Sequence, residues 1–179
     1  MKNILNIIIL FSFLNTYSQG NLSDRKIPSD TNVITNHSTT ILGKKVNYSA
    51  QIGTQPIWDA NGEVIATLHY TYYKRTDIDN NTNRPLVFSF NGGPGSASIW
   101  MHMGYTGPYN LKIDDEGNPI QPYGYKSNPY SILDVADIVF VNPINIGYSR
   151  ILKSMTKKEA ADKFFGVNQD IEYLAEWIS

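Results

Sequence analysis

The 179-residue sequence contains no cysteine, which excludes disulfide bonds, thiolate metal sites, a cysteine nucleophile and a lipid anchor attached to cysteine. It also has no run of lysines or arginines, and its formal net charge is −1, so we expect no nucleic acid as a partner. The apolar stretch near the N-terminus is too short to span a bilayer comfortably, so we expect no stable membrane anchor. Neither histidine spacing nor acidic clustering predicts a metal site, and no cofactor is expected.

Residues 1–18 predict a secretory signal peptide. Lys2 gives a positive start, residues 4–14 are mostly apolar, and small residues at spacing two precede a predicted cleavage after Ser18. The alternative is a buried N-terminal strand or helix. Export without cysteine is compatible with a secreted or periplasmic bacterial protein that does not rely on disulfides. The next segment, 19–44, is polar and rich in Ser, Thr and Asn, and we expect a linker or mobile arm there.

Residues 45–179 are expected to form the folded domain. The hydrophobic content of the whole chain is 41% and the charged content is 17%, as in globular proteins. Apolar residues alternate over 46–53 and 63–74, on either side of a turn at 59–62. This pattern predicts a β-hairpin or meander.

Two short apolar runs, 85–90 and 136–141, predict buried strands. A long excursion rich in Gly, Pro and Tyr separates them at 104–131, and a loop of that length is usually functional. A capping box at Thr156 and Glu159 predicts the start of one helix. The apolar face of that helix recurs at spacings of three and four and comprises Ala160, Phe164, Val167, Ile171, Leu174 and Ile178. This order favours an α/β sheet with covered faces.

The most informative segment is 91–96, Asn-Gly-Gly-Pro-Gly-Ser, which follows the first of these predicted strands directly. Glycine leaves backbone N–H groups uncovered, and such groups can hold the oxyanion that forms in acyl transfer. Gly93 is the first candidate donor and Gly92 the second; the alternative is a plain tight turn. The Asn91 amide could bind a substrate carboxylate or brace the loop.

The residues that would attack a substrate are missing. No Gly-x-Ser-x-Gly elbow occurs, and Ser149 has only the first half of one. Ser96 would be a neighbour of the oxyanion rather than the attacking group. The histidines, His37, His69 and His102, all precede any position for an elbow, whereas α/β-hydrolases place histidine last. His102 follows the glycine loop and is a candidate pocket-wall or structural residue rather than a base.

Together these segments resemble the serine carboxypeptidase family, peptidase family S10. Residues 86–98 resemble its Asn-Gly-Gly-Pro-Gly oxyanion segment, and 128–131 resemble its Asn-Pro-Tyr-Ser-Trp element. Residues 137–149 resemble its Phe-Val-Asp-Pro-Val-Gly-Thr-Gly-Tyr-Ser element, and the Gly-Pro pair at 107–108 also has a family counterpart. The elements keep the family order and spacing from about residue 46 to residue 179.

The resemblance implies the N-terminal part of an α/β-hydrolase fold: a β-meander, an oxyanion-loop strand and a covering helix in an incomplete sheet. The Gly93 N–H would be one oxyanion donor, and Asn91 would bind the C-terminal carboxylate of a peptide substrate. Tyr105 and His102 are the further candidates for substrate contact. The family's nucleophile strand follows a helix that resembles 156–178. The catalytic Ser, Asp and His are therefore expected outside this chain, in a C-terminal half that would be its partner, and the chain alone should be inactive.

Three departures from the family pattern bear on function. Tyr105 stands where eukaryotic carboxypeptidases have a glutamate that helps bind the carboxylate, which weakens the case for strict C-terminal recognition. Asn142 and Asn145 replace an Asp and a Gly of the family loop. The alternatives are an acyltransferase of the same family, a non-catalytic secreted remnant or binding module, and another α/β-hydrolase. Among the last, proline aminopeptidases usually have His where Asn91 stands.

Overall fold

The computed structural model of the chain describes residues 28–79, 83–91 and 95–179. The predicted signal peptide and the two oxyanion candidates, Gly92 and Gly93, lie outside the described residues.

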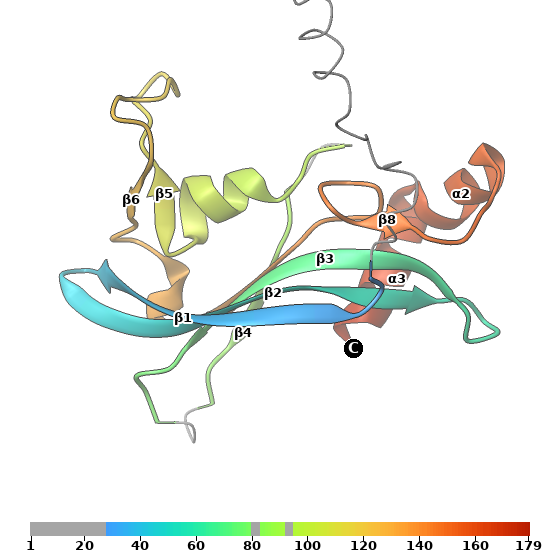
Figure 1. Ribbon diagram of the computed structural model, residues 1–179, viewed down its shortest axis with the longest axis horizontal. Coiled ribbons are helices and arrows are strands. Elements are labelled where there is room, and N and C mark those ends of the chain that lie inside the picture. The colour runs from blue at the N-terminus through green and yellow to red at the C-terminus, as the bar shows by residue number, and fades with distance from the viewer. Residues whose placement is uncertain (1–27, 80–82, 92–94) are drawn as a thin grey trace, which may run out of the picture.

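A mixed sheet is the centre of the fold, and its strand order within the described residues is β1-β2-β3-β7-β4, with β8 paired to β3 (Figure 1). The sheet is antiparallel except between β4 and β7, which run parallel. The strands are β1 (Thr31–Ile41), β2 (Lys44–Trp58), β3 (Val64–Arg75), β4 (Leu86–Ser89), β7 (Asp137–Val141) and β8 (Arg150–Ile151).

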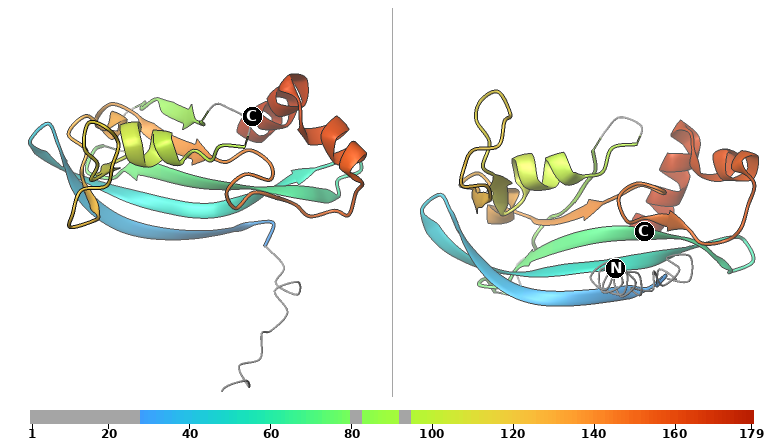
Figure 2. Two further views of the ribbon diagram at one scale, coloured as in Figure 1. Left: turned by 90° about the horizontal axis from the view of Figure 1, so that it is seen from above. Right: turned by 45° about the horizontal axis from the view of Figure 1, so that its top comes forward.

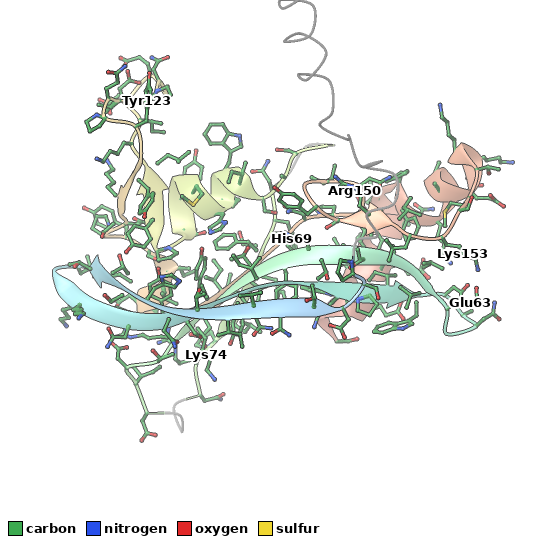
Figure 3. All side chains as sticks on the ribbon, in the orientation of Figure 1. Glu63, His69, Lys74, Tyr123, Arg150 and Lys153 are labelled. Carbon is green, nitrogen blue, oxygen red and sulfur yellow. The ribbon has the colours of Figure 1, made fainter. Side chains whose placement is uncertain are left out.

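The predicted hairpin is present as β2 and β3. The strand β2 extends beyond the predicted 46–53, whereas β3 keeps the predicted length and is shifted by one residue. Asp59 closes its turn, because its Oδ1 accepts the backbone N–H groups of Asn61 at 2.9 Å and Glu63 at 3.0 Å. The ammonium of Lys153 lies 2.5 Å from the Glu63 carboxylate, as the labelled side chains of Figure 3 illustrate. That contact ties the hairpin end to the segment after β8.

The prediction of a polar linker or arm is wrong for residues 31–41, which form β1. This strand pairs with β2 in an unbroken antiparallel register from Thr31 opposite Thr54 to Ile41 opposite Lys44. Only two of its side chains are buried, Thr39 and Ile41. Backbone pairing and β-branched residues therefore form β1, and a strand exposed on both faces has no apolar alternation for a sequence pattern to detect.

The two predicted apolar strands are confirmed as the parallel pair β4 and β7. All five residues of β7 are buried, as expected for a strand inside a sheet. By contrast, β4 pairs only with β7 among the described residues, and Leu86 on it is 48% exposed. Two parallel neighbours need a long crossover, and the segment between β4 and β7 provides it.

The predicted long excursion carries structure of its own and lies over one end of the sheet (Figure 2). It contains a small hairpin of β5 (Tyr109–Leu111) and β6 (Tyr125–Ser127). A π-helix, η3 (Met101–Thr106), overlaps the start of the excursion, and a 3₁₀ turn, η4 (Ile132–Asp134), follows its end. Asn128 is buried at the centre of this region. Its Nδ2 donates to the carbonyls of Tyr105 at 2.7 Å and Gly107 at 2.9 Å. The Asn-Pro-Tyr-Ser element is thus an internal brace of the excursion.

The predicted single helix is two helices, α2 (Lys157–Phe164) and α3 (Val167–Ile178), over the other end of the sheet. The capping box is confirmed, because the Thr156 hydroxyl accepts the Glu159 N–H and the Glu159 carboxylate accepts the Thr156 N–H. Gly166 breaks the helix, so the apolar spacing read through the break does not describe one face. Val167 is 78% exposed instead of buried.

The main core lies between the helices and the sheet. Trp177 of α3 packs against Tyr70 and Phe88, with ring centroids 6.1 and 6.0 Å away. The buried residues of this cluster are Ile57, Ile65, Ala66, Leu68, Val141, Ile144, Phe164 and Tyr173.

Candidate functional site

The candidate site lies where the parallel strands β4 and β7 end. Ligands of α/β sheets bind outside the carboxyl ends of such strands. Asn91 follows β4 closely, and Asn142 follows β7 directly. The segment from Gly95 onward returns to the same place, because Ser98 donates its backbone N–H to Asn142 Oδ1 at 2.9 Å and its hydroxyl to the Val141 carbonyl at 2.5 Å. The described end of the glycine loop is therefore fastened to β7.

Asn91 links the two described ends of this loop. Its Nδ2 donates a 2.8 Å hydrogen bond to the Ser96 hydroxyl, and the side chain is half-buried. This contact supports the bracing role that the sequence left open. The carboxylate-binding role remains a prediction.

A cavity of about 750 Å³ opens beside Asn91, between the ends of β4 and β7 and the start of α3. Its walls are mainly apolar and include Phe90, Pro143, Ile146, Val167 and Leu174. The polar groups on it are few, among them Asn91, Ser96 and Asp170. Small-molecule sites have this composition, with an apolar wall that takes a side chain and a few polar groups that orient it.

His102 is a residue of η3. It lies away from this cavity and packs against the sheet. Its ring stacks on Phe140 with centroids 4.5 Å apart and planes 17° apart, and its Nε2 is 2.6 Å from the Tyr73 hydroxyl. Burial lowers the pKa of His102 to about 4, and the nearby His69 adds to the effect. A neutral imidazole held between two aromatic rings is a packing group, which matches the structural alternative of the sequence analysis.

Tyr105 is also outside the cavity. It lies in η3 with 65% of its surface exposed, and its carbonyl accepts the Asn128 amide. Of the three substrate-contact candidates, the structure places only Asn91 on the cavity wall.

Ser149 is fully buried, and backbone groups occupy its hydroxyl. The Oγ donates to the Asn142 carbonyl at 2.6 Å and accepts the His69 N–H at 2.8 Å. It therefore joins the end of β7 to β3. A buried hydroxyl that holds two backbone groups has a structural role.

Sequence reasoning missed the importance of Asn142, which it noted only as a departure from a family pattern. The available signal was position, since a polar residue directly after a buried strand lies at a sheet edge where ligand loops meet. Within the described ranges, no cluster of His, Asp and Glu has the arrangement of a metal site. The same ranges contain no helix of the length and apolarity that a membrane crossing requires.

Comparison with known proteins gives the family. The serine carboxypeptidase family model matches residues 57–179. Similar curated proteins include carboxypeptidase Y of Candida albicans, 32% identical over 96 residues, and carboxypeptidase Y homolog A of Pyrenophora tritici-repentis, 31% identical over 96 residues. Each of these alignments covers 53% of this chain and 16% of the relative.

A plant relative is aligned over a longer segment. Serine carboxypeptidase-like 31 of Arabidopsis thaliana is 28% identical over 125 residues, which cover 66% of this chain and 22% of that protein. The chain thus spans about a fifth or less of the length of these relatives. With its glycine loop and both parallel strands inside the matched region, the chain belongs to the serine carboxypeptidase family.

Proposed function

We propose that this chain is the N-terminal part of a secreted or periplasmic serine carboxypeptidase-like hydrolase with an α/β-hydrolase fold. In its full-length form, the protein would cleave C-terminal residues from peptides. The observation that carries the proposal is the segment 95–98, which follows the glycine motif and is attached at the carboxyl ends of two parallel strands, beside an apolar cavity. Family membership supports the reaction class.

The chemistry assigns this chain the electrostatic part of the reaction. A serine from outside the chain would attack the scissile carbonyl, helped by a histidine and an acid that also lie outside it. The backbone N–H of Gly93, with Gly92 as second choice, would hold the oxyanion. Removing one such donor typically lowers kcat about 10²–10³-fold. Water would then release the acyl group.

Substrate binding would use the cavity. The apolar wall suits an uncharged side chain of the peptide, and the Asn91 amide, which lies on the same wall, would donate to the terminal carboxylate. Tyr105 is 65% exposed and does not line this cavity. Recognition of the carboxylate would therefore rest on Asn91 and on groups from the remainder of the protein.

The sheet supports an incomplete α/β-hydrolase fold. Among the described residues, β4 has a neighbour on one side only. Leu86 at its start and Phe90 just after it are 48% and 43% exposed. A further strand that paired with β4 would cover this edge. If it ran parallel to β4, it would also bring its own carboxyl end next to the glycine loop, where a nucleophile is needed.

The test compares two proteins on an N-blocked dipeptide and measures the release of the C-terminal amino acid. The gene product in its longest encoded form is expected to release it, to be inactivated by a serine-directed phosphonate, and to lose activity about 10²-fold or more when Gly93→Pro removes the N–H donor. The 179-residue chain is expected to be inactive. Robust turnover by the short chain would contradict the assignment, and acyl transfer to an added alcohol in preference to water would favour the acyltransferase.

A further inference from the structure

Asn142 uses every polar atom that it has. Its backbone N–H donates to the His69 carbonyl at 3.1 Å, and its own carbonyl accepts the Ser149 hydroxyl. Its side-chain Oδ1 accepts the Ser98 N–H at 2.9 Å, and its Nδ2 lies 3.3 Å from His69 Nδ1. One amide therefore connects β3, the end of β7 and the segment after the glycine loop.

The Ser98 N–H fixes the orientation of this amide. A backbone N–H can only donate, so the amide oxygen must face Ser98, and the NH₂ group must face His69. His69 Nδ1 is then the acceptor, which places the imidazole proton on Nε2. The tautomer of His69 and the attachment of Ser98 are thus set by the same amide.

The segment Gly-Tyr-Ser at 147–149 holds the pair in place. Gly147 has φ of +56°, and a Cβ there would lie 2.5 Å from Asn142 Nδ2, so a side chain would displace the amide. The ring centroids of Tyr148 and His69 are 5.3 Å apart. The Ser149 hydroxyl accepts the His69 N–H and donates to the Asn142 carbonyl. Figure 3 shows His69 on the side of β3 that faces η3 and the loop before β8.

We infer that Asn142 is a positioning residue that holds the segment 95–98 on β7, and that protonation of His69 releases this segment. A doubly protonated imidazole would point an N–H at the amide NH₂. The amide must then flip to offer its oxygen to His69, which leaves its NH₂ facing the Ser98 N–H, two donors without an acceptor. The inference concerns this attachment and depends on the proposed function only for its effect on catalysis.

The surroundings of His69 determine whether the segment 95–98 is released in acid or in base. Burial lowers the pKa of His69, so the neutral, attached form is favoured near neutral pH and release is expected in acid. The titratable side chains that face it are Tyr148, through the ring contact, and His102, whose positive form would repel it. In the described part of the chain, no carboxylate forms a hydrogen bond or ion pair with His69 that would oppose this.

The experiment measures amide hydrogen exchange of Ser98, corrected for intrinsic rate, at about pH 8 and about pH 5 in the protein as the gene encodes it. Wild-type protection of Ser98 is expected to fall at least about tenfold in acid. Asn142→Leu should lose it at both pH values, because no acceptor remains. Asn142→Asp should keep it at both, since a carboxylate accepts Ser98 N–H and an imidazolium N–H together. Nitrogen chemical shifts of His69 should report the Nε2–H tautomer in the wild type.

Asn145→Gly is the matched control. Asn145 lies in the same loop, has φ of +61° that glycine accepts, and receives the Ile151 N–H on its side chain at 3.3 Å. This variant should speed exchange at Ile151 and leave Ser98 unchanged. If Asn142→Leu does not fold, the wild type and Asn142→Asp decide the matter, because only the wild type should lose Ser98 protection in acid. Wild-type protection that does not change with pH, an Nδ1–H tautomer, or an equal loss at Ser98 in Asn145→Gly would overturn the inference. Release of Ser98 without any loss of turnover would instead contradict the catalytic role of the loop.

Discussion

At the scale of single residues, the buried imidazoles make the fold sensitive to acid. Burial lowers the pKa of His102 to about 4, and it also lowers the pKa of His69. In the unfolded chain a histidine has a pKa of about 6.5. Between these values the unfolded state binds more protons than the folded state, so stability rises with pH across this window.

His102→Phe is therefore expected to flatten the pH dependence of stability. Phenylalanine keeps the stacking on Phe140 and removes the titrating group. The wild type should lose stability as the pH falls from about 6.5 to about 4, with His102 responsible for a share on the order of 3 kcal/mol once the pH is below both values. Urea unfolding at a series of pH values measures it. The slope that remains should reflect His69.

Tyr73→Phe is the control for this prediction. Like His102→Phe, it removes the 2.6 Å hydrogen bond between the Tyr73 hydroxyl and the His102 ring, but it leaves the imidazole in place. The variant should be less stable at all pH values and should keep the acid slope. Equal slopes in the wild type and in His102→Phe would show that the buried imidazole is not responsible.

At the scale of elements, local chemistry decided which sequence predictions succeeded. The capping box at Thr156 is a short-range signal, and the structure contains both of its hydrogen bonds. The apolar runs of β4 and β7 were equally direct. The strand β1 gave no such local signal. It is stabilised by pairing with β2, and most of its side chains are exposed. Gly166 was missed as a helix break because the apolar spacing continued through it.

The candidate site was predictable only in part, for the same reason. Asn91 could be named because it lies next to a distinctive glycine segment. The attachment of Ser98 to Asn142 joins residues 44 positions apart, and no local pattern reports such a contact. His102 is close in sequence to the glycine loop, yet the turn of η3 directs its ring toward Phe140 on the sheet. Sequence proximity to the loop therefore does not bring this ring to the cavity wall.

Thr156→Ala tests the contribution of the capping box to α2. The substitution removes the side-chain acceptor of the Glu159 N–H and should cost about 1 kcal/mol of stability, as chemical denaturation would measure. Lys157→Ala, at an exposed position of the same helix turn, should change stability by less than about 0.5 kcal/mol. A loss of equal size in both variants would mean that general helix propensity, and not the cap, accounts for the effect.

At the scale of the whole molecule, the two edges of the sheet differ. The β1 edge is lined by exposed polar side chains with few apolar ones, among them Val33 at 65% exposure. The β4 edge is short, and the apolar residues Leu86 and Phe90, at its two ends, are partly exposed. Under the proposed function, a further strand of the full-length protein would cover β4. Within the described residues of the 179-residue chain, β4 has no strand on its outer side, which favours association between copies.

Leu86→Lys should therefore have opposite effects in the two forms of the protein. In the 179-residue chain, a lysine on the β4 edge should reduce self-association, as sedimentation would measure, because a charge at an exposed edge opposes strand pairing. In the full-length protein the same change should lower stability by about 1–3 kcal/mol, because it places a charge where apolar packing is expected.

Val33→Lys on the opposite edge is the matched control and should change neither property by more than a small amount. If Val33→Lys reduces association as much as Leu86→Lys does, then β1 rather than β4 is the reactive edge. If Leu86→Lys leaves the full-length protein as stable as the wild type, no strand covers β4 there, and the incomplete-sheet interpretation is wrong.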